Sequence, residues 1–249
     1  MQTPKGILSS RRSMGSCKAD LCVRWEGRGS LYGTGPAMAG EKRVEMRANL
    51  VESVVRPIAR ALVPGSVRPW ARDILNAFQV RRNPARIALV SEILPAYARL
   101  GWRILWIGCR RYTKGYGRML TKHGGECWTT DIEPKHAKWG RKHRHFTCDV
   151  VRIDELIPSE AFDTVLCNGV FGFGVDTCEA QLAALQAMGG ILKPGGRLLL
   201  GWNTERVEDP GGLAYVRAAF VGDDLLGRGP LDEIPEAGYV YRFLRRLGN

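Results

Sequence analysis

The sequence lacks the features that mark membrane-spanning and secreted proteins. No run of about 18 apolar residues occurs anywhere in the 249-residue chain, so no segment is predicted to cross a bilayer as a helix. Residues 1–20 contain no compact apolar stretch followed by a small-residue cleavage site, and we therefore expect no secretory signal. We expect a cytoplasmic protein, with attachment to a membrane surface as the alternative.

Paired cysteines are also missing. The seven cysteines include no C-x-x-C pair, and their number is odd. Cys127, Cys148 and Cys167 stand in apolar surroundings, where a free thiol behaves as a small hydrophobic residue. A disulfide framework is therefore not expected, and a reducing compartment is.

The net charge of +12 is distributed unevenly along the chain. Residues 1–103 hold 18 Lys and Arg against 7 Asp and Glu, whereas residues 104–249 hold 19 against 18. The basic excess therefore belongs mostly to the N-terminal part. It fits either an anionic partner or solvated helix faces, and we favour the second.

The chain divides into three predicted parts. Residues 1–43 are rich in Gly, Ser and basic residues and have no hydrophobic period, which predicts a disordered or flexible basic tail. Residues 44–100 show helical periodicity and form a predicted helical extension or cap. Its last helix is expected to begin at Asn83-Pro84, to kink at Pro95 and to end at Gly101.

Residues 101–249 alternate between short apolar strands and helical segments. This pattern predicts an α/β domain with a mostly parallel sheet that is buried on both faces and wound right-handedly. A helix is expected from Cys178 to Leu192. The expected strands are residues 103–107, 126–131, 145–148, 162–168, 196–202 and 239–246.

Candidate site residues follow these strands, because ligands of open parallel sheets bind beyond the carboxyl ends of the strands. Gly108 allows the chain to turn tightly beneath a ligand. Asp131 can accept hydrogen bonds from two ribose hydroxyls, and Asp149 can accept one from an adenine amino group. Two local roles remain open: Asp131 as a cap of the next helix, and Asp149 as a turn residue. The loop from Asn168 to Gly174 can cover the reacting group.

Residues 103–202 resemble the core of class I S-adenosylmethionine-dependent methyltransferases. The resemblance rests on ILWIGC, TTDIEP, TCDV, FDTVLCNGVFG and LKPGGRLLLGW. It implies a Rossmann-like, doubly wound, seven-stranded sheet with a reversed C-terminal hairpin, and S-adenosylmethionine as the cofactor. It assigns cofactor contacts to Gly108, Asp131, Asp149 and Asn168, and backbone contacts to Cys109, Ile132 and Val150.

The first motif departs from the family pattern. Trp106 stands where the family has an acidic residue, and Arg110 and Tyr112 replace later glycines. We expect Tyr112 to join the cofactor site, with Thr113 and Arg110 also able to reach the methionine carboxylate. Loss of cofactor binding is the competing interpretation. A dehydrogenase is disfavoured because the run after the first strand reads GCRRYT, not G-x-G-x-x-G.

The predicted function is methyl transfer to a small metabolite, a lipid-linked molecule or a glycan. An RNA or protein methyltransferase and a catalytically silent scaffold are the alternatives. Phe171, Phe173 and Trp202 are expected to line the acceptor mouth, and residues 203–238 to form part of a lid. No catalytic base is assigned, since only position favours Asn168 and Asp176.

The sequence also bears on metal, membrane and nucleic acid partners. A His-x-His metal site at His143 and His145 is disfavoured against an exposed basic segment, so no metal is predicted. The basic helices before the first strand allow three uses, in this order: a cap over the cofactor, contact with an anionic membrane through residues 44–80, and RNA binding. Nucleic acid is not expected as a partner, because no RNA-binding module is recognisable.

Overall fold

The computed structural model describes residues 82–248 of the chain. The predicted tail of residues 1–43 and the helices predicted within residues 44–79 lie outside the described residues. All described residues belong to one compact unit of the chain. Among them, no helix has both the length and the apolar character needed to cross a bilayer.

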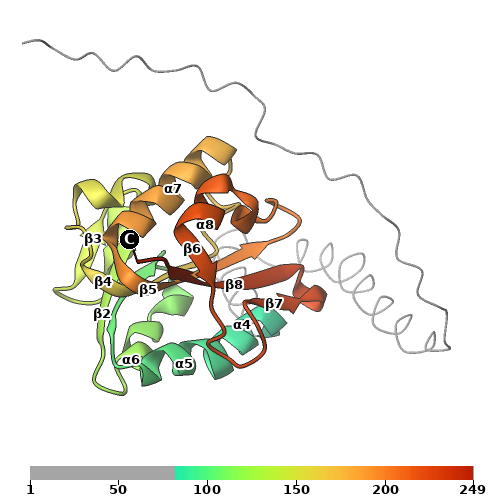
Figure 1. The fold of residues 1–249 in the computed structure, drawn as a ribbon. Coiled ribbons are helices and arrows are strands. Elements are labelled where there is room, and N and C mark those ends of the chain that lie inside the picture. The colour runs from blue at the N-terminus through green and yellow to red at the C-terminus, as the bar shows by residue number, and fades with distance from the viewer. Residues whose placement is uncertain (1–81, 249) are drawn as a thin grey trace, which may run out of the picture. The chain divides into compact units, whose positions relative to one another are not determined.

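One mixed sheet forms the centre of the described unit (Figure 1). Its strands are β1 (Arg103–Ile107), β2 (Glu126–Asp131), β3 (His145–Thr147), β4 (Phe162–Asn168), β5 (Leu192–Asn203), β6 (Phe220–Gly222), β7 (Leu231–Ile234) and β8 (Tyr239–Arg246). Each predicted strand is present, and the largest difference in bounds is the earlier start of β5.

The strand order is β3-β2-β1-β4-β5-β8-β6, with β7 also paired to β8. Strands β1 to β5 are parallel, and β8 runs antiparallel to β5, β6 and β7. The predicted Rossmann-like fold and reversed C-terminal strand are therefore confirmed. The sheet has eight strands instead of the predicted seven, because β6 and β7 pair with different parts of the same edge of β8.

Helices cover both faces of the sheet (Figure 1). One layer holds α4 (Pro84–Ala88), the π-helical turn η2 (Leu89–Ile93), α5 (Leu94–Arg99) and α6 (Tyr116–Leu120). The other holds the 3₁₀ segment η5 (Val150–Glu155), α7 (Cys178–Ile191) and α8 (Ala214–Ala219). Further 3₁₀ segments are η3 (Arg111–Thr113), η4 (Pro134–Trp139), η6 (Pro210–Gly212) and η7 (Pro235–Ala237).

The helical segment before β1 forms largely as its sequence predicts. The side chain of Asn83 accepts a hydrogen bond from the backbone N–H of Arg86 at 3.1 Å, which caps the first turn. Gly101 ends the segment with a φ of +66°. Near Pro95, which has no N–H to donate, the chain forms the π-helical turn η2, so the expected disturbance takes the form of a widened turn.

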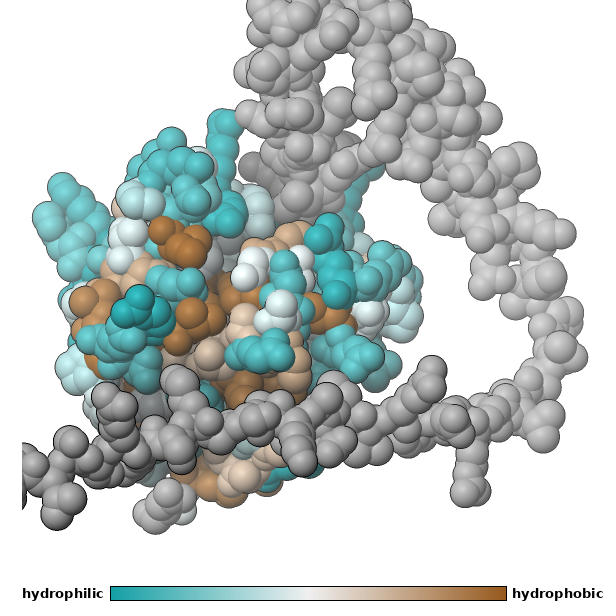
Figure 2. Space-filling model, turned by 90° about the horizontal axis from the view of Figure 1, so that it is seen from above, coloured by the Kyte–Doolittle hydropathy of each residue, from teal (hydrophilic) through white to brown (hydrophobic). Residues whose placement is uncertain are grey.

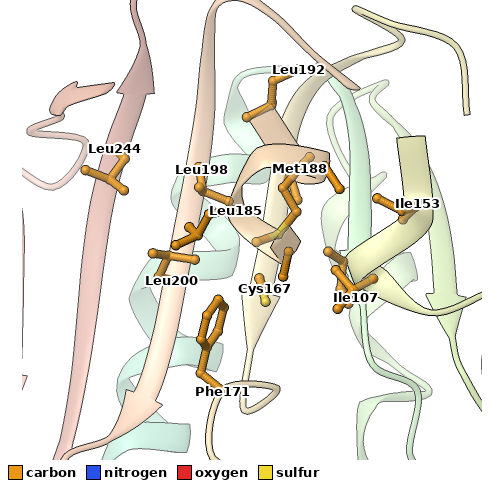
Figure 3. Close-up of a cluster of buried hydrophobic side chains, with 14 of the residues drawn as sticks. Ile107, Ile153, Cys167, Phe171, Leu185, Met188, Leu192, Leu198, Leu200 and Leu244 are labelled. Atoms are coloured by element: carbon orange, nitrogen blue, oxygen red, sulfur yellow. The ribbon is translucent and has the colours of Figure 1, made fainter. Parts of the chain in front are cut away.

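Side chains alternate along the central strands and fill two cores. On β5, Leu198 and Leu200 face α7, whereas Leu199 faces the layer of α4 to α6. Figure 3 shows Leu185 and Met188 of α7 directed at these strands. The outer surface of the layer that contains α7, seen in Figure 2, mixes small hydrophobic patches with hydrophilic residues.

The core of α7 gives a direct test of packing. We expect Leu185→Ala to lower the free energy of unfolding by about 2–5 kcal/mol, because this side chain is fully buried and alanine preserves the helix. Leu156→Ala, at a side chain with 54% exposure, is the matched control and should change stability by less than about 0.5 kcal/mol. Urea unfolding followed by circular dichroism measures both. Equal losses in the two variants would contradict the assigned core.

Candidate functional site

A cavity opens at the carboxyl ends of β1, β2 and β4. This is where the strand order changes direction, because β1 pairs with β2 on one side and β4 on the other. Ligands of open parallel sheets bind at such a point.

Seven of the eight residues predicted to bind the cofactor line this cavity: Gly108, Tyr112, Asp131, Ile132, Asp149, Val150 and Asn168. Arg110 and Thr113, expected near the methionine carboxylate, also line it. Cys109 does not. Its side chain is buried beneath the turn, and burial raises the pKa of its thiol to about 11. The backbone N–H of Cys109 is donated to Asp131, so this residue supports the site from below.

Gly108 forms the turn under the cavity. Its φ of +87° is one that residues with a side chain rarely adopt. The N–H of Gly108 donates to the Thr130 carbonyl at 2.8 Å, and its own carbonyl accepts from the indole Nε1 of Trp106 at 2.6 Å. Trp106, which replaces the family's acidic residue, therefore holds the turn with an indole hydrogen bond.

Asp131 is the most heavily bonded side chain of the site. Its Oδ2 accepts from the N–H of Cys109 at 2.6 Å and from Nη1 of Arg110 at 2.7 Å. Its Oδ1 accepts from the N–H of Glu133 at 2.9 Å and lies 3.0 Å from Nδ1 of His136. An ionised carboxylate has about four acceptor positions, and all four are engaged here.

These hydrogen-bond donors keep the Asp131 carboxylate ionised. Burial opposes ionisation, but the hydrogen bonds from Cys109, Glu133 and His136 and the charge of Arg110 outweigh it, so the pKa of Asp131 is lowered. Its side chain is only 3% exposed, whereas that of Arg110 is 43% exposed. Arg110 is therefore the partner that can move away and leave an oxygen of Asp131 to a ligand.

Asp149 lies across the cavity and has more free capacity. Its Oδ1 accepts from the N–H of Val151 at 3.2 Å, which caps η5 and matches the turn role left open by the sequence. The other oxygen has no hydrogen bond within the described residues. Ile132 is 58% exposed beside it, and Val150 is buried, so apolar side chains flank a carboxylate that can still accept.

Asn168 is fixed by a strand far away in sequence. Its Oδ1 accepts from the hydroxyl of Tyr239, on β8, at 2.9 Å. Burial raises the pKa of Tyr239, so the hydroxyl stays a neutral donor. Gly201 on β5 makes room for this pair, because a Cβ there would lie 2.3 Å from Oδ1 of Asn168.

The loop after β4 closes the opposite side of the cavity. Val170, Phe173, Gly174 and Val175 line it, and Phe173 is 55% exposed. The guanidinium of Arg206 lies 4.2 Å from the centre of the Phe173 ring, and its Nη1 donates to the carbonyl of Gly172 at 3.2 Å. Arg206, in the segment after β5, therefore holds the loop after β4 in place.

Of the three aromatic residues predicted to line the acceptor mouth, only Phe173 lines the cavity. Phe171 is fully buried and Trp202 is 2% exposed, and both pack in the core against α7. An aromatic residue near the end of a strand can lie either in the core or at the cavity. The alternation of side chains along the strand decides which of the two it is. Asp176 does not line the cavity either, because its Oδ1 accepts from the N–H of Gly174 and closes the loop.

The residues present fit S-adenosylmethionine. Asp149 has an unused acceptor, and the apolar side chains of Ile132 and Val150 line the same cavity. Within residues 82–248, no cluster of three or more His, Cys, Asp or Glu side chains could hold a metal ion.

Three supporting residues were not predicted from the sequence. His136 and Arg206 contact site residues from neighbouring segments, and Tyr239 does so from the last strand. His136 stands in the DIEPKH segment directly after β2, which was a usable signal. Nothing in the local sequence connects Tyr239 to Asn168, since strand order alone brings them together.

Comparisons with known proteins agree with this geometry. Residues 105–200 match the family model described as a methyltransferase domain. No curated protein matches the sequence at a significant level.

Solved structures share the fold at low sequence identity. N-methyltransferase NodS from Bradyrhizobium japonicum WM9 is 15% identical, covers 67% of this chain and 99% of its own, and has a TM-score of 0.50. The same enzyme in complex with S-adenosyl-l-homocysteine is 14% identical, covers 68% of this chain and 90% of its own, and has a TM-score of 0.51. The PH0226 protein from Pyrococcus horikoshii OT3 is 13% identical over 66% of this chain and 90% of its own, with a TM-score of 0.50.

The hydrogen bonds of Asp131 predict a pH-dependent contribution to stability. Because its pKa is lower in the folded state, this contribution is complete above the unfolded value of 3.8 and is lost as the pH falls through the folded value. We expect Asp131→Asn to lower stability by about 1–3 kcal/mol at pH 7, and the difference from wild type to shrink as the pH falls below 3.8. Thermal unfolding across this range measures it.

Asp154→Asn, at an exposed carboxylate of η5, is the control and should follow wild type at every pH. A difference between wild type and Asp131→Asn that persists unchanged at pH 3 would show that the charge of Asp131 does not stabilise the fold.

Proposed function

We propose that this chain is a class I S-adenosylmethionine-dependent methyltransferase that transfers a methyl group to a small metabolite, a lipid-linked molecule or a glycan. The match of residues 105–200 to the model of a methyltransferase domain supports the proposal. One observation carries the proposal. Two carboxylates, Asp131 and Asp149, reach the same cavity from the ends of neighbouring strands, with Gly108 turning beneath it.

The residues divide the cofactor between them. Asp149 accepts a hydrogen bond from the adenine amino group, and Ile132 and Val150 flank the base. Asp131 faces the ribose hydroxyls. Its oxygens are occupied in the described structure, so a nucleoside must displace one of the present donors, and half-exposed Arg110 is the donor that can leave.

The methionine carboxylate of the cofactor is then a second partner for Arg110 in the same cavity. Tyr112, Thr113 and Arg110 line the side where the methionine part would lie, and a guanidinium pairs strongly with a carboxylate. Arg110 therefore passes from Asp131 to the methionine carboxylate when the cofactor binds. This exchange replaces the backbone contacts that glycines supply in the usual motif.

The transfer step requires alignment more than acid–base chemistry. S-Adenosylmethionine supplies a methyl group on a positively charged sulfur, which is a good leaving group. The chain contributes proximity and orientation: the loop from Gly169 to Val175, held by Arg206, forms the wall against which an acceptor lies. Phe173 gives that wall an apolar aromatic surface suited to a small or lipid-linked acceptor.

A catalytically silent scaffold is the alternative that a specific observation favours. All four acceptor positions of Asp131 are engaged, and Trp106, Arg110 and Tyr112 replace family residues. If Arg110 did not leave, the ribose could not bind. The charge of the chain would favour an RNA or protein acceptor as a further alternative.

Isothermal titration calorimetry with S-adenosylhomocysteine tests the proposed site. We expect wild type to bind and Asp149→Asn to bind at least about tenfold more weakly, because the amide offers a weaker acceptor to the adenine amino group. Asp154→Asn removes a carboxylate from the same 3₁₀ segment and should bind as wild type does. Absence of heat with a folded wild-type protein would favour the scaffold.

The exchange of Arg110 has its own test with two ligands. Arg110→Ala should weaken binding of S-adenosylhomocysteine by roughly tenfold, because a charge-assisted pair is lost. It should leave binding of 5′-methylthioadenosine equal or tighter, since this nucleoside has no carboxylate and Asp131 is then free. Arg111→Ala, at the exposed neighbouring residue, is the control. Equal weakening for both ligands would refute the exchange.

A further inference from the structure

The near-neutral charge of residues 104–249 conceals a strong separation of charge. Residues 104–144 hold 10 Lys and Arg against 3 Asp and Glu, whereas residues 145–249 hold 9 against 15. The basic segment contains α6, η4 and the turn before β3, whereas the acidic residues are distributed over the remaining elements on both faces of the sheet. The basic excess of the domain is therefore concentrated in residues 104–144.

The basic side chains form one surface, which we call the basic patch: Arg111, Lys114, Arg118, Lys138, Arg141 and Lys142. All are exposed except Arg141, which is partly exposed. Arg141 lies against α6, since a Cβ on Gly117 would be 2.4 Å from its Cδ, and Lys114, Trp139 and Arg141 surround one small hollow. The two segments of the patch therefore meet.

Nothing in residues 82–248 neutralises the patch. None of its six side chains forms an ion pair with a carboxylate of the described residues, whereas nearby Lys135 and Arg144 pair with Glu133 and Glu126. Six unpaired cations on one surface create a local positive potential that favours an anionic partner.

The patch borders the mouth of the cavity. Arg111 lies between Arg110 and Tyr112, which both line the cavity, and Tyr112 is 49% exposed. Ile132, on the same rim, is 58% exposed. Cations beside exposed apolar side chains are the combination that anchors a protein at a membrane interface.

The aromatic rings of this region already carry contacts on one face. The guanidinium of Arg86 lies 4.7 Å from the ring centre of Tyr112. The ring of Trp139 carries the ammonium of Lys138 at 4.7 Å and packs against His136 at 4.9 Å. Proteins that bind single strands stack bases on free aromatic faces, whereas a lipid surface needs only cations beside exposed apolar side chains, which this region offers.

We propose that the basic patch docks the domain on an anionic phospholipid membrane, with lipid phosphates and other acidic headgroups as its ligands. The cavity mouth then lies beside the bilayer. The six cations that carry the docking are not assigned to the cofactor, so docking can be tested apart from the proposed transferase activity, although Tyr112 and Ile132 on the shared rim belong to both.

Co-sedimentation of the full chain with vesicles tests the proposal. We expect binding to vesicles of phosphatidylcholine with phosphatidylglycerol, little binding to phosphatidylcholine alone, and loss of binding in high salt. Lys114→Gln/Arg118→Gln should weaken binding roughly 25-fold, since each cation near an anionic surface contributes about a factor of five.

Arg152→Gln/Arg217→Gln is the matched control. It removes the same charge from exposed residues of η5 and α8 on the other layer, and it should bind vesicles as wild type does. Unchanged vesicle binding by the Lys114→Gln/Arg118→Gln variant would overturn the proposal, as would equal weakening in the control. So would patch-dependent binding to a 20-nucleotide RNA by a chain that ignores anionic vesicles. Thermal unfolding confirms that each variant is folded.

Discussion

The site is organised around the buried carboxylate of Asp131. Two backbone N–H groups, from Cys109 and Glu133, tie it to the turn after β1 and to the segment after β2. These bonds join the ends of two parallel strands that have no direct chain connection at this point. A buried charge is tolerated only when its acceptor positions are filled, so the same bonds that keep Asp131 ionised also shape the floor of the cavity.

The departures from the family motif acquire a physical explanation in this setting. An indole N–H from Trp106 holds the carbonyl of Gly108, where an acidic side chain would be expected. Arg110 covers Asp131 with a cation, and its half-exposed side chain can be exchanged. The altered turn therefore keeps its shape through side-chain hydrogen bonds, where glycine-rich turns use backbone groups.

The separation of charge adds a second level of organisation. Lys and Arg gather on α6, η4 and the following turn, whereas residues 145–249 hold more Asp and Glu than Lys and Arg. The sum over residues 104–249 hides this, because opposite charges far apart in space cancel in a count. The basic patch and the cavity share a border at Arg111 and Tyr112.

The sequence by itself determined six of the eight strands, the mostly parallel character of the sheet and the carboxylates that follow the strands. These features depend on local alternation of apolar residues and on short motifs, and seven of the eight assigned residues accordingly lie around one cavity. Only the tertiary structure decided that Cys109 lies beneath the site, that Phe171 and Trp202 belong to the core, and that Tyr239 reaches Asn168. Each of these depends on which side of a strand faces the cavity or on which strands become neighbours, and both follow from packing over long sequence distances.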